Sequence, residues 1–354
     1  MKKLLFATCC IAFLSGSLGA AAQKKSAAKN VLTQTLKGKS WSADNGNGTF
    51  TNPLFYDEFS DPDIIRVGED YYLAGTTMHS VPGLVVLHSK DLVNWEFSSY
   101  CFDRFDDSDD FNLRNGKEAY GQGIWAPAIR YHNGKFYIFS NINGHGLQVY
   151  ISDSAKGPWT HHKVNGDIYD LSVLFDEDGK IYAVHKYGNV TVTELKPDLS
   201  GPVEGSSKVV IPEGNAMGEG HHVYKINGMY YILSADYSPM GRMQCARSKS
   251  IWGPYETCVI SERESYGYAA GWSVGNMGIG RPLPEDGFKF QNNKPNGLNL
   301  GCATIHQGGI VQAPDGKWWG VSMQDFNAVG RTVCLSPVTW VDGWPYFGLE
   351  KNLG

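Results

Sequence analysis

Three carboxylates stand at comparable places in a repeating pattern of the sequence. Asp61 lies seven residues before a turn glycine, and Asp170 and Glu219 each lie nine residues before one. Two carboxyl groups that face each other can divide the work of hydrolysis, because one donates a proton to the leaving oxygen while the other activates water. In glycosidases that invert configuration the two groups stand about 6.5–9.5 Å apart. The residue types therefore point to cleavage of a glycosidic bond, provided that the fold brings them together.

The pattern that positions these residues is a hairpin that recurs five times. A short apolar run, a glycine turn and an aromatic run follow one another, which is typical of a β-hairpin. The turn glycines are Gly68, Gly134, Gly179, Gly228 and Gly316. Further strands that end in Ser and lead to a polar turn and an aromatic residue complete the repeats. Four strands per repeat around an axis predict an all-β fold, a five-bladed β-propeller.

The first strand of each repeat lies innermost in a propeller, so residues at the starts of these strands converge around the central channel. Besides the three carboxylates, Trp125 and His306 occupy such positions, nine and ten residues before their glycines. We therefore expect an active site at the central channel. A crowded ring of carboxylates with apolar walls would raise the pKa of the one that acts as the acid.

Two intervals between the turn glycines are longer than a plain blade requires. The glycines are separated by 66, 45, 49 and 88 positions. The longer intervals predict insertions near residues 101–123 and 261–305. Insertions of this length predict walls around a pocket.

Several short motifs keep a common order along the chain. They are Ser60–Asp63, His88–Trp95, Trp125–Pro127, Asp176–Lys180, Glu219–His221, His306–Gly309, Gly330–Arg331 and Trp340–Pro345. Each is weak alone, but the ordered set resembles glycoside hydrolase family 43 from about residue 48 to 348. The 261–305 insertion and the C-terminal motifs most resemble its β-xylosidase and α-L-arabinofuranosidase branches. The resemblance implies an inverting hydrolase of arabinose- or xylose-containing chains.

The resemblance also implies a role for each candidate residue. Asp61 matches the general base, Glu219 the general acid, and Asp170 the carboxylate that orients the acid and modulates its pKa. Arg331 matches an arginine that hydrogen-bonds the sugar. His306 matches a channel histidine, which in some relatives contacts a central calcium ion or water.

Simpler structural roles stay open for these residues. Asp61 precedes a proline and could form a turn, His306 could be a hydrogen-bonded core histidine, and Arg331 could form an interblade salt bridge. Trp125 and Trp272 could stack on sugar faces or fill blades. Among the neighbours, Asp63 is expected to be a strand-edge partner, and Glu213, the rival acid, lies in an ordinary turn sequence.

We expect no cofactor to be required for the chemistry. A structural calcium ion in the central channel, contacted by His306 through water, is one option. The sequence shows no oxygen-rich ligand loop of the kind that calcium prefers. No residue is therefore assigned as a direct metal ligand.

The composition favours a sugar as partner over a nucleic acid. The formal net charge is −5, 19% of the residues are charged and 13% are aromatic. The sequence shows no dense Lys/Arg cluster after the N-terminus, which argues against nucleic acid as the main partner. An oligosaccharide or polysaccharide substrate fits an aromatic-rich, weakly charged surface.

The N-terminal residues predict export. Met1-Lys2-Lys3, an apolar run to about Leu18 and the small residues Ala20–Ala22 are typical of a signal peptide over 1–22. The run is too short for a membrane span, so we expect a secreted or periplasmic protein. Residues 23–40 are expected to form a polar linker and 41–354 the catalytic propeller. Relatives in this branch carry a C-terminal β-sandwich, which we expect to be absent or truncated here.

Five cysteines follow the predicted signal peptide, at positions 101, 245, 258, 302 and 334. Cys245 and Cys258 flank a plausible strand pair. One disulfide between them is an option, and buried free thiols are the alternative.

The leading hypothesis is an exo-acting, inverting hydrolase that releases xylose or arabinofuranose from hemicellulose or arabinan oligosaccharides. An endo-arabinanase would need an open groove rather than a pocket. A catalytically silent glycan-binding propeller would have lost a carboxylate, and all three are present. Interaction propellers of the WD or Kelch type have different repeat signatures.

Overall fold

The computed structural model describes residues 42–350, apart from 79–80, 82, 106–107, 216, 238–239, 262–306 and 326–329. Several predictions lie outside the described residues. They are the signal peptide, the linker, nearly all of the second insertion, His306 and Trp272. In the described part, no helix is long and apolar enough to cross a membrane.

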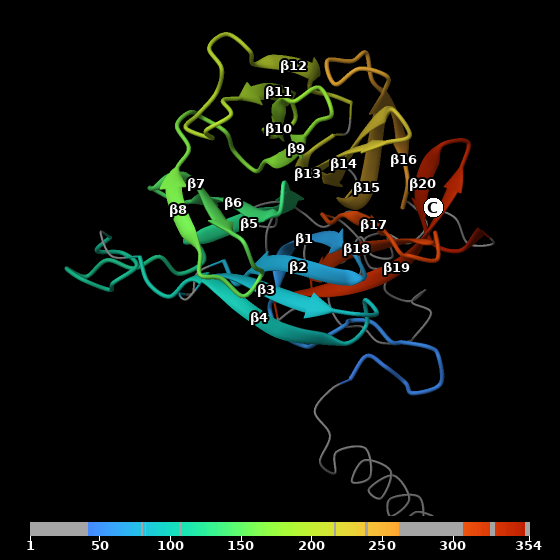
Figure 1. Ribbon diagram of the computed structural model, residues 1–354, viewed down its shortest axis with the longest axis horizontal. Helices are drawn as coiled ribbons and strands as arrows, with labels where there is room; N and C mark the ends of the chain where they lie inside the picture. Colours follow the sequence, from blue (N-terminus) through green and yellow to red (C-terminus); the bar gives the residue numbers. More distant parts are fainter. Residues whose placement is uncertain are drawn as a thin grey trace, which may run out of the picture. The chain divides into compact units, whose positions relative to one another are not determined.

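The described chain forms five antiparallel sheets of four strands each, which follow one another along the sequence (Figure 1). The first sheet contains β1 (Ser60–Val67), β2 (Asp70–Thr76), β3 (Gly83–Ser89) and β4 (Trp95–Phe102). The second contains β5 (Ile124–His132), β6 (Lys135–Ile142), β7 (Gly146–Ser152) and β8 (Thr160–Lys163). The third contains β9 (Ser172–Phe175), β10 (Ile181–His185), β11 (Val190–Leu195) and β12 (Lys208–Ile211). The fourth contains β13 (Glu219–Ile226), β14 (Met229–Tyr237), β15 (Met240–Ser248) and β16 (Glu256–Val259). The fifth contains β17 (Ile310–Gln312), β18 (Trp318–Asp325), β19 (Arg331–Val341) and β20 (Trp344–Phe347).

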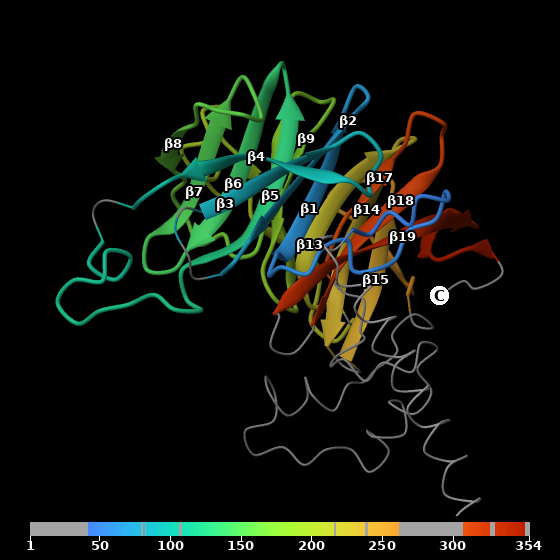
Figure 2. The same ribbon diagram turned by 90° about the horizontal axis from the view of Figure 1, so that it is seen from below.

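The five sheets are the blades of a propeller, which confirms the predicted all-β fold. The first strands of the five blades lie next to one another. β1 lies beside β5 and β17, and β9 lies beside β5 and β13 (Figure 2). In Figure 2 the paired strands β5, β6 and β7 of the second blade stand side by side. The first strands therefore surround the axis, as the repeat pattern predicts.

Apolar side chains from adjacent blades pack into continuous core clusters. Between the first and second blades, Val86, Ile129 and Ile138 are fully buried in one such cluster. Burying a side chain of this size contributes about 1.5–3 kcal/mol. This packing between blades fixes the places at which the inner strands begin.

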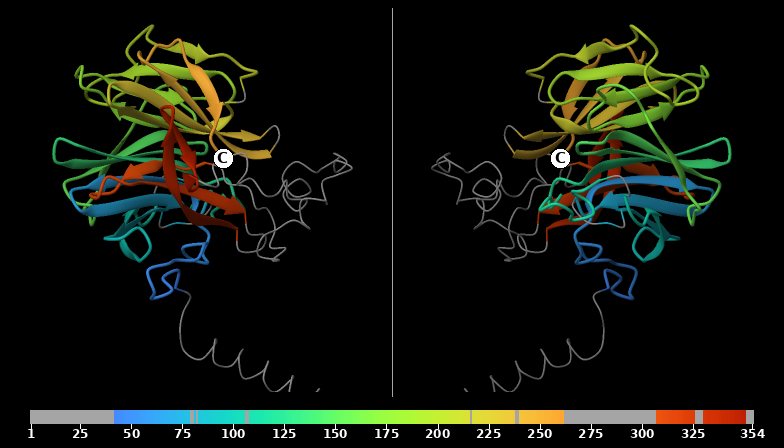
Figure 3. Two further views of the ribbon diagram at one scale, coloured as in Figure 1. Left: turned by 90° about the vertical axis from the view of Figure 1, so that its right-hand side faces the viewer. Right: turned by 90° about the vertical axis from the view of Figure 1, so that its left-hand side faces the viewer.

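The ring closes between the fifth and first blades through the segment that precedes β1 (Figure 3). The Leu54 N–H donates to Val333 O at 2.8 Å, and the Phe59 N–H donates to Arg331 O at 2.7 Å. β20 pairs with β19 only from Val338 onward, so residues 331–335 offer this segment a strand edge. The closure brings the start of β19 against the start of β1, where Asp61 lies.

The cysteines in the described residues are free thiols. Cys101, Cys245 and Cys334 are buried, and Cys258 is partly buried. Cys245 and Cys258 stand directly opposite each other on β15 and β16 without a bond between them. The structure thus has the free-thiol alternative, and Cys302 lies outside the described residues.

Candidate active site

The backbone bends near the start of the inner strand of every blade, where the side chains that face the channel lie. One residue near the start of every inner strand has a positive φ: Asp61 (51°), Ala126 (23°), Asp170 (50°), Gly220 (66°) and Gln307 (50°). The pairing register of β1, β5 and β13 is also irregular at these places. A non-glycine residue in this conformation costs about 1–3 kcal/mol and is kept where function needs it. The spacing of the carboxylates did not reveal this fivefold kink.

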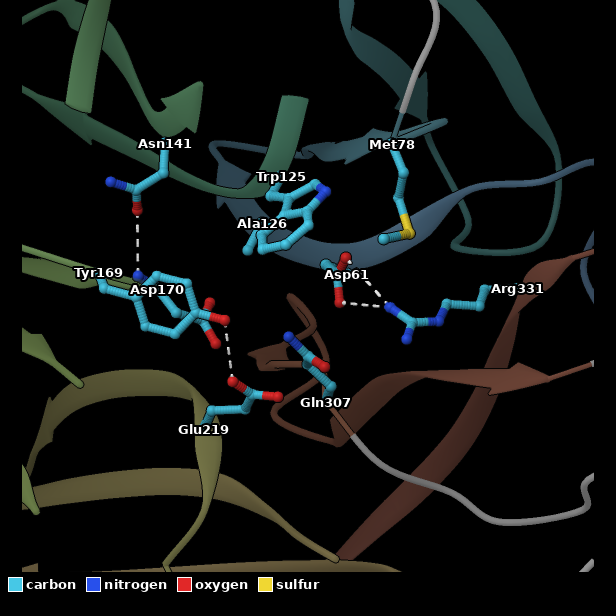
Figure 4. Close-up of a pocket in the computed structure, with 10 residues that line it drawn as sticks. All are labelled: Asp61, Met78, Trp125, Ala126, Asn141, Tyr169, Asp170, Glu219, Gln307 and Arg331. Carbon is cyan, nitrogen blue, oxygen red and sulfur yellow. Dashed lines mark hydrogen bonds and ion pairs between the residues drawn. The ribbon is translucent and has the colours of Figure 1, made fainter. Parts of the chain in front are cut away.

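A pocket of about 160 Å³ opens at these kinks (Figure 4). It is lined by Asp61, Met78, Trp125, Ala126, Asn141, Tyr169, Asp170, Glu219, Gln307 and Arg331. The predicted residues Asp61, Asp170, Glu219, Trp125 and Arg331 thus come together. Glu213, the rival acid, is exposed and does not line this pocket.

Asp61 is buried and held by the last blade. Arg331 Nη1 lies 3.3 Å from Asp61 Oδ1, and the Ser60 hydroxyl donates to Asp61 Oδ2 at 2.6 Å. The same guanidinium group donates to Ser60 Oγ at 3.1 Å. Arg331 therefore forms an interblade ion pair and also lines the pocket. These contacts hold both oxygens of the Asp61 carboxyl group in place at the edge of the pocket.

Asp170 and Glu219 lie on the other side of the pocket (Figure 4). The Gly220 N–H donates to Asp170 Oδ2 at 2.8 Å, so Asp170 fixes the residue that follows Glu219. The Asp170 N–H donates to Asn141 Oδ1 at 3.0 Å. The Tyr169 hydroxyl donates to Glu219 Oε2 at 3.1 Å. Asn141 and Tyr169 were not predicted as site residues.

The pKa values of both carboxyl groups on this side of the pocket are raised. Burial, together with the negative charges of Glu219 and Asp61, raises the pKa of Asp170 to about 8. Burial also raises the pKa of Glu219, with a further contribution from Asp61. The Tyr169 hydrogen bond and Arg331 act against that increase in the pKa of Glu219. Glu219 is the less buried of the two and borders the pocket, which suits a proton donor.

Asp63 joins several blades beneath the pocket. It is 1% exposed, and its Oδ2 accepts the Ile129 N–H at 2.9 Å and Arg130 Nη1 at 2.5 Å. Its Oδ1 lies 3.5 Å from His222 Nε2 on β13. Arg130 in turn donates to the Ser172 hydroxyl and to Val173 O on β9. Asp63 is therefore a buried link between the first, second and fourth blades, and Arg130 extends it to the third. The prediction that Asp63 is a strand-edge partner did not include these contacts with other blades.

The histidines that follow the acid have structural contacts. His221 Nδ1 lies 2.5 Å from Ser234 Oγ, and its Nε2 lies 2.6 Å from Lys186 O. Burial lowers the pKa of His221 to about 4, so its imidazole stays neutral. Within the described ranges, no group of three His, Cys, Asp or Glu side chains could hold a metal ion. The channel-calcium prediction thus depends on His306, which lies outside these ranges.

The sequence profile of Glycosyl hydrolases family 43 matches residues 50–267, which is more than half of the chain. The chain belongs to this family. A beta-xylosidase of Formosa agariphila is 30% identical, and the alignment covers 93% of this chain and 56% of that protein. A non-reducing end alpha-L-arabinofuranosidase of Bacteroides ovatus is 34% identical over 85% of this chain and 54% of that protein.

Solved structures of family 43 proteins agree with this assignment. A bifunctional GH43-CE protein of Bacteroides eggerthii matches with a TM-score of 0.69 and 34% identity, over 85% of this chain and 35% of that chain. The GH43B protein of a Bacteroides ovatus xyloglucan locus matches with a TM-score of 0.66 and 31% identity, over 84% of this chain and 56% of that chain. The family resemblance inferred from the motifs is confirmed, including its β-xylosidase and α-L-arabinofuranosidase branch. The chain spans about half the length of the curated relatives that it matches.

Proposed function

We propose that this family 43 chain is an inverting, exo-acting glycoside hydrolase. Its substrates would be hemicellulose or arabinan oligosaccharides, from whose ends it releases xylose or arabinofuranose. The observation behind the proposal is that Asp61, Asp170 and Glu219 line one pocket at the propeller axis. The names of the matched relatives, beta-xylosidase and alpha-L-arabinofuranosidase, support the class of sugar.

In this mechanism Glu219 donates its proton to the glycosidic oxygen as the bond from that oxygen to the anomeric carbon breaks. A water molecule on the opposite face of the sugar attacks the anomeric carbon and gives a proton to Asp61. Arg331 and Ser60 hold Asp61 in place through their contacts with its two oxygens. Asp170 orients Glu219 through the Gly220 N–H. The negative charge of Glu219 in turn adds to the burial that raises the pKa of Asp170.

The pocket favours an exo-acting enzyme over an endo-acting one. A space of about 160 Å³ suits a single sugar unit better than an extended chain. Trp125 lines it with its indole, and the ring nitrogen donates to Gly121 O at 3.3 Å in the first predicted insertion. The indole face is then available to stack on the sugar, as proposed for this tryptophan. Arg331 borders the same space and is proposed to bind the sugar as well.

Three further features of the protein are proposed from its sequence. Residues 1–22 direct export, so that the enzyme acts in the periplasm or outside the cell. His306 and Trp272 contribute to the sugar site. A structural calcium ion, if bound, sits in the channel near His306 and takes no part in proton transfer.

The test combines substrate choice with stereochemistry. Initial rates on 4-nitrophenyl β-D-xylopyranoside and 4-nitrophenyl α-L-arabinofuranoside, and on xylo- and arabino-oligosaccharides, would identify the sugar. Proton NMR of the first product formed would give its anomeric configuration. We expect turnover with inversion and release of single sugars. Internal cleavage would favour an endo-arabinanase, retention would refute the water-activating role of Asp61, and no turnover on any substrate would favour a glycan-binding propeller.

A further inference from the structure

Tyr169 touches the proposed proton donor from the preceding blade. It lies just before Asp170, and its hydroxyl donates to Glu219 Oε2 at 3.1 Å (Figure 4). The two residues are 50 positions apart in the sequence, so propeller assembly makes this contact. Glu219 Oε1 is not part of this hydrogen bond.

The backbone around Tyr169 is fixed on both sides. Asn141 accepts the Asp170 N–H at 3.0 Å and donates its Nδ2 to Ile168 O at 2.9 Å, so one side chain clamps the residues before and after Tyr169. The Lys186 N–H donates to Tyr169 O at 2.9 Å. Three hydrogen bonds therefore set the position of the residue whose hydroxyl reaches Glu219. This arrangement resembles the second layer of contacts that fixes a catalytic group in its working geometry.

The phenol can act only as a hydrogen-bond donor to a charged Glu219. Tyr169 is 37% exposed, and its partial burial, together with the negative charges of Glu219 and Asp170, raises the pKa of its hydroxyl above the usual value, so the hydroxyl keeps its proton. A hydroxyl donating to a carboxylate forms a stronger bond than one donating to a neutral carboxylic acid. The contact therefore strengthens when Glu219 loses its proton.

We propose that Tyr169 is a positioning residue for acid catalysis. Its hydroxyl donates to Glu219 Oε2, so the acidic proton of Glu219 is carried by Oε1. The same hydrogen bond stabilises the carboxylate that forms when Glu219 transfers this proton. The inference rests on the proposed role of Glu219 as the acid. In the step itself, the Glu219 Oε1–H bond breaks and the proton joins the leaving oxygen. That oxygen also takes the electron pair of its bond to the anomeric carbon. Tyr169 exchanges no proton and only lowers the free energy of the resulting anion.

This role predicts a dependence on the leaving group that packing alone would not produce. A sugar alcohol leaves poorly and needs the proton from Glu219, whereas 2,4-dinitrophenolate leaves well without it. Loss of the Tyr169 hydroxyl should therefore slow the cleavage of a disaccharide and spare an activated aryl glycoside. A packing defect would slow both substrates to a similar extent.

The experiment compares wild type with Tyr169→Phe, which keeps the ring, on the disaccharide and on the 2,4-dinitrophenyl glycoside of the same sugar. We expect kcat/KM to fall about 10- to 100-fold for the disaccharide and less than about threefold for the activated glycoside. We also expect the alkaline limb of the kcat/KM profile to move to higher pH, because the hydroxyl lowers the pKa of Glu219. The matched control is Tyr131→Phe. Tyr131 is 43% exposed and lies near the end of β5, whereas the pocket residues Trp125 and Ala126 lie at its start. This substitution should change neither quantity.

A second readout does not depend on turnover. In protein labelled with ¹³C-glutamate at the carboxyl carbon, the Glu219 signal, assigned with Glu219→Gln, should titrate at higher pH in Tyr169→Phe. An unchanged titration, or an equal fall on both substrates without a shift of the pH profile, would overturn the inference while leaving the proposed function intact. A wild-type protein that hydrolyses neither substrate would contradict the proposed function and this inference together.

Discussion

The guanidinium group of Arg331 lies 3.3 Å from the carboxylate of Asp61, across the seam where the last blade meets the first. The same seam is closed by the backbone bond from Phe59 N–H to Arg331 O. The residue that orients the proposed base is therefore part of the joint that closes the ring. The start of β19, at Arg331, therefore closes the ring and also fixes the position of the water-activating carboxylate.

Replacing Arg331 with lysine should reduce activity much more than stability. Arg331 Nη1 contacts both Asp61 and Ser60. Lysine keeps the positive charge, but its shorter side chain ends in an ammonium group that cannot take the position of Nη1. The backbone bond to Phe59 does not involve the side chain and should persist. We expect kcat/KM to fall about 100-fold or more, with little change in the midpoint of thermal unfolding. Equal losses of activity and stability would instead assign Arg331 to ring closure alone.

Asp170→Asn should become more stable than wild type as the pH rises. In the folded protein Asp170 holds its proton up to about pH 8, whereas the unfolded chain releases it near the ordinary value of 3.8. The contribution of Asp170 to the stability of wild type therefore falls between about pH 4 and pH 8, because at this position the unfolded state binds fewer protons there. The asparagine variant lacks this loss, so its gain over wild type should grow across that window to about 1 kcal/mol or more.

Urea unfolding of both proteins at pH 5 and pH 8 measures this difference, and Asp153→Asn on the surface is the control. The same Asp170 variant should lose about 100-fold or more of its activity, because Glu219 loses its partner carboxyl. A stability difference that is independent of pH would contradict the raised pKa of Asp170.

Asp63→Ala should destabilise the protein strongly although Asp63 does not line the main pocket. The substitution leaves the largely buried Arg130 guanidinium group without its carboxylate and removes the link from β1 to β5 and β13. Breaking a buried pair in this way costs about 3–5 kcal/mol. Denaturant unfolding measures the loss. Asp153→Ala breaks the exposed pair with Lys135 and should change stability little. A small effect of Asp63→Ala would mean that the interblade network is dispensable.

Gly220→Ala should disturb catalysis through the backbone. Gly220 has a φ of +66°, and an added Cβ would lie 2.4 Å from the Gln307 side chain. Its N–H holds Asp170, and it directly follows Glu219, so any shift moves both carboxyls. Gly228→Ala is the matched control, because its φ is +77° and nothing lies within 4 Å of the added Cβ. Both variants should lose about 1–2 kcal/mol of stability from backbone strain, but only Gly220→Ala should lose most of its activity. Similar activities in the two variants would contradict the account of the kink.

Much of this architecture could be predicted because its signals are local. A turn glycine followed by aromatic residues is written within one hairpin, and its recurrence predicts the blades. The spacing of Asp61, Asp170 and Glu219 before these glycines predicts their convergence, since inner strands begin at one face of a propeller.

The missed features depend on contacts between distant segments. Asn141 meets Asp170 from 29 positions away, and the Tyr169 hydroxyl meets Glu219 from 50 positions away. An interblade salt bridge of Arg331 was an option from the sequence, but its partner Asp61, 270 positions away, was not named. Tyr169 carried one usable signal, since it adjoins a predicted catalytic carboxylate at the mouth of the channel. The positive φ of Asp61 and Asp170 had none, because neither residue type requires that conformation.

Asp61 and Glu219 are proposed to hydrolyse a glycosidic bond as base and acid in this pocket. The most direct measurement is kcat/KM for the best oligosaccharide substrate in wild type, Asp61→Asn and Glu219→Gln, with circular dichroism confirming that each variant is folded. We predict a fall of at least about 1,000-fold in each variant, with activity of Glu219→Gln largely restored on a 2,4-dinitrophenyl glycoside, which needs no acid. A folded variant that keeps more than about a tenth of the wild-type rate on the oligosaccharide would contradict the account.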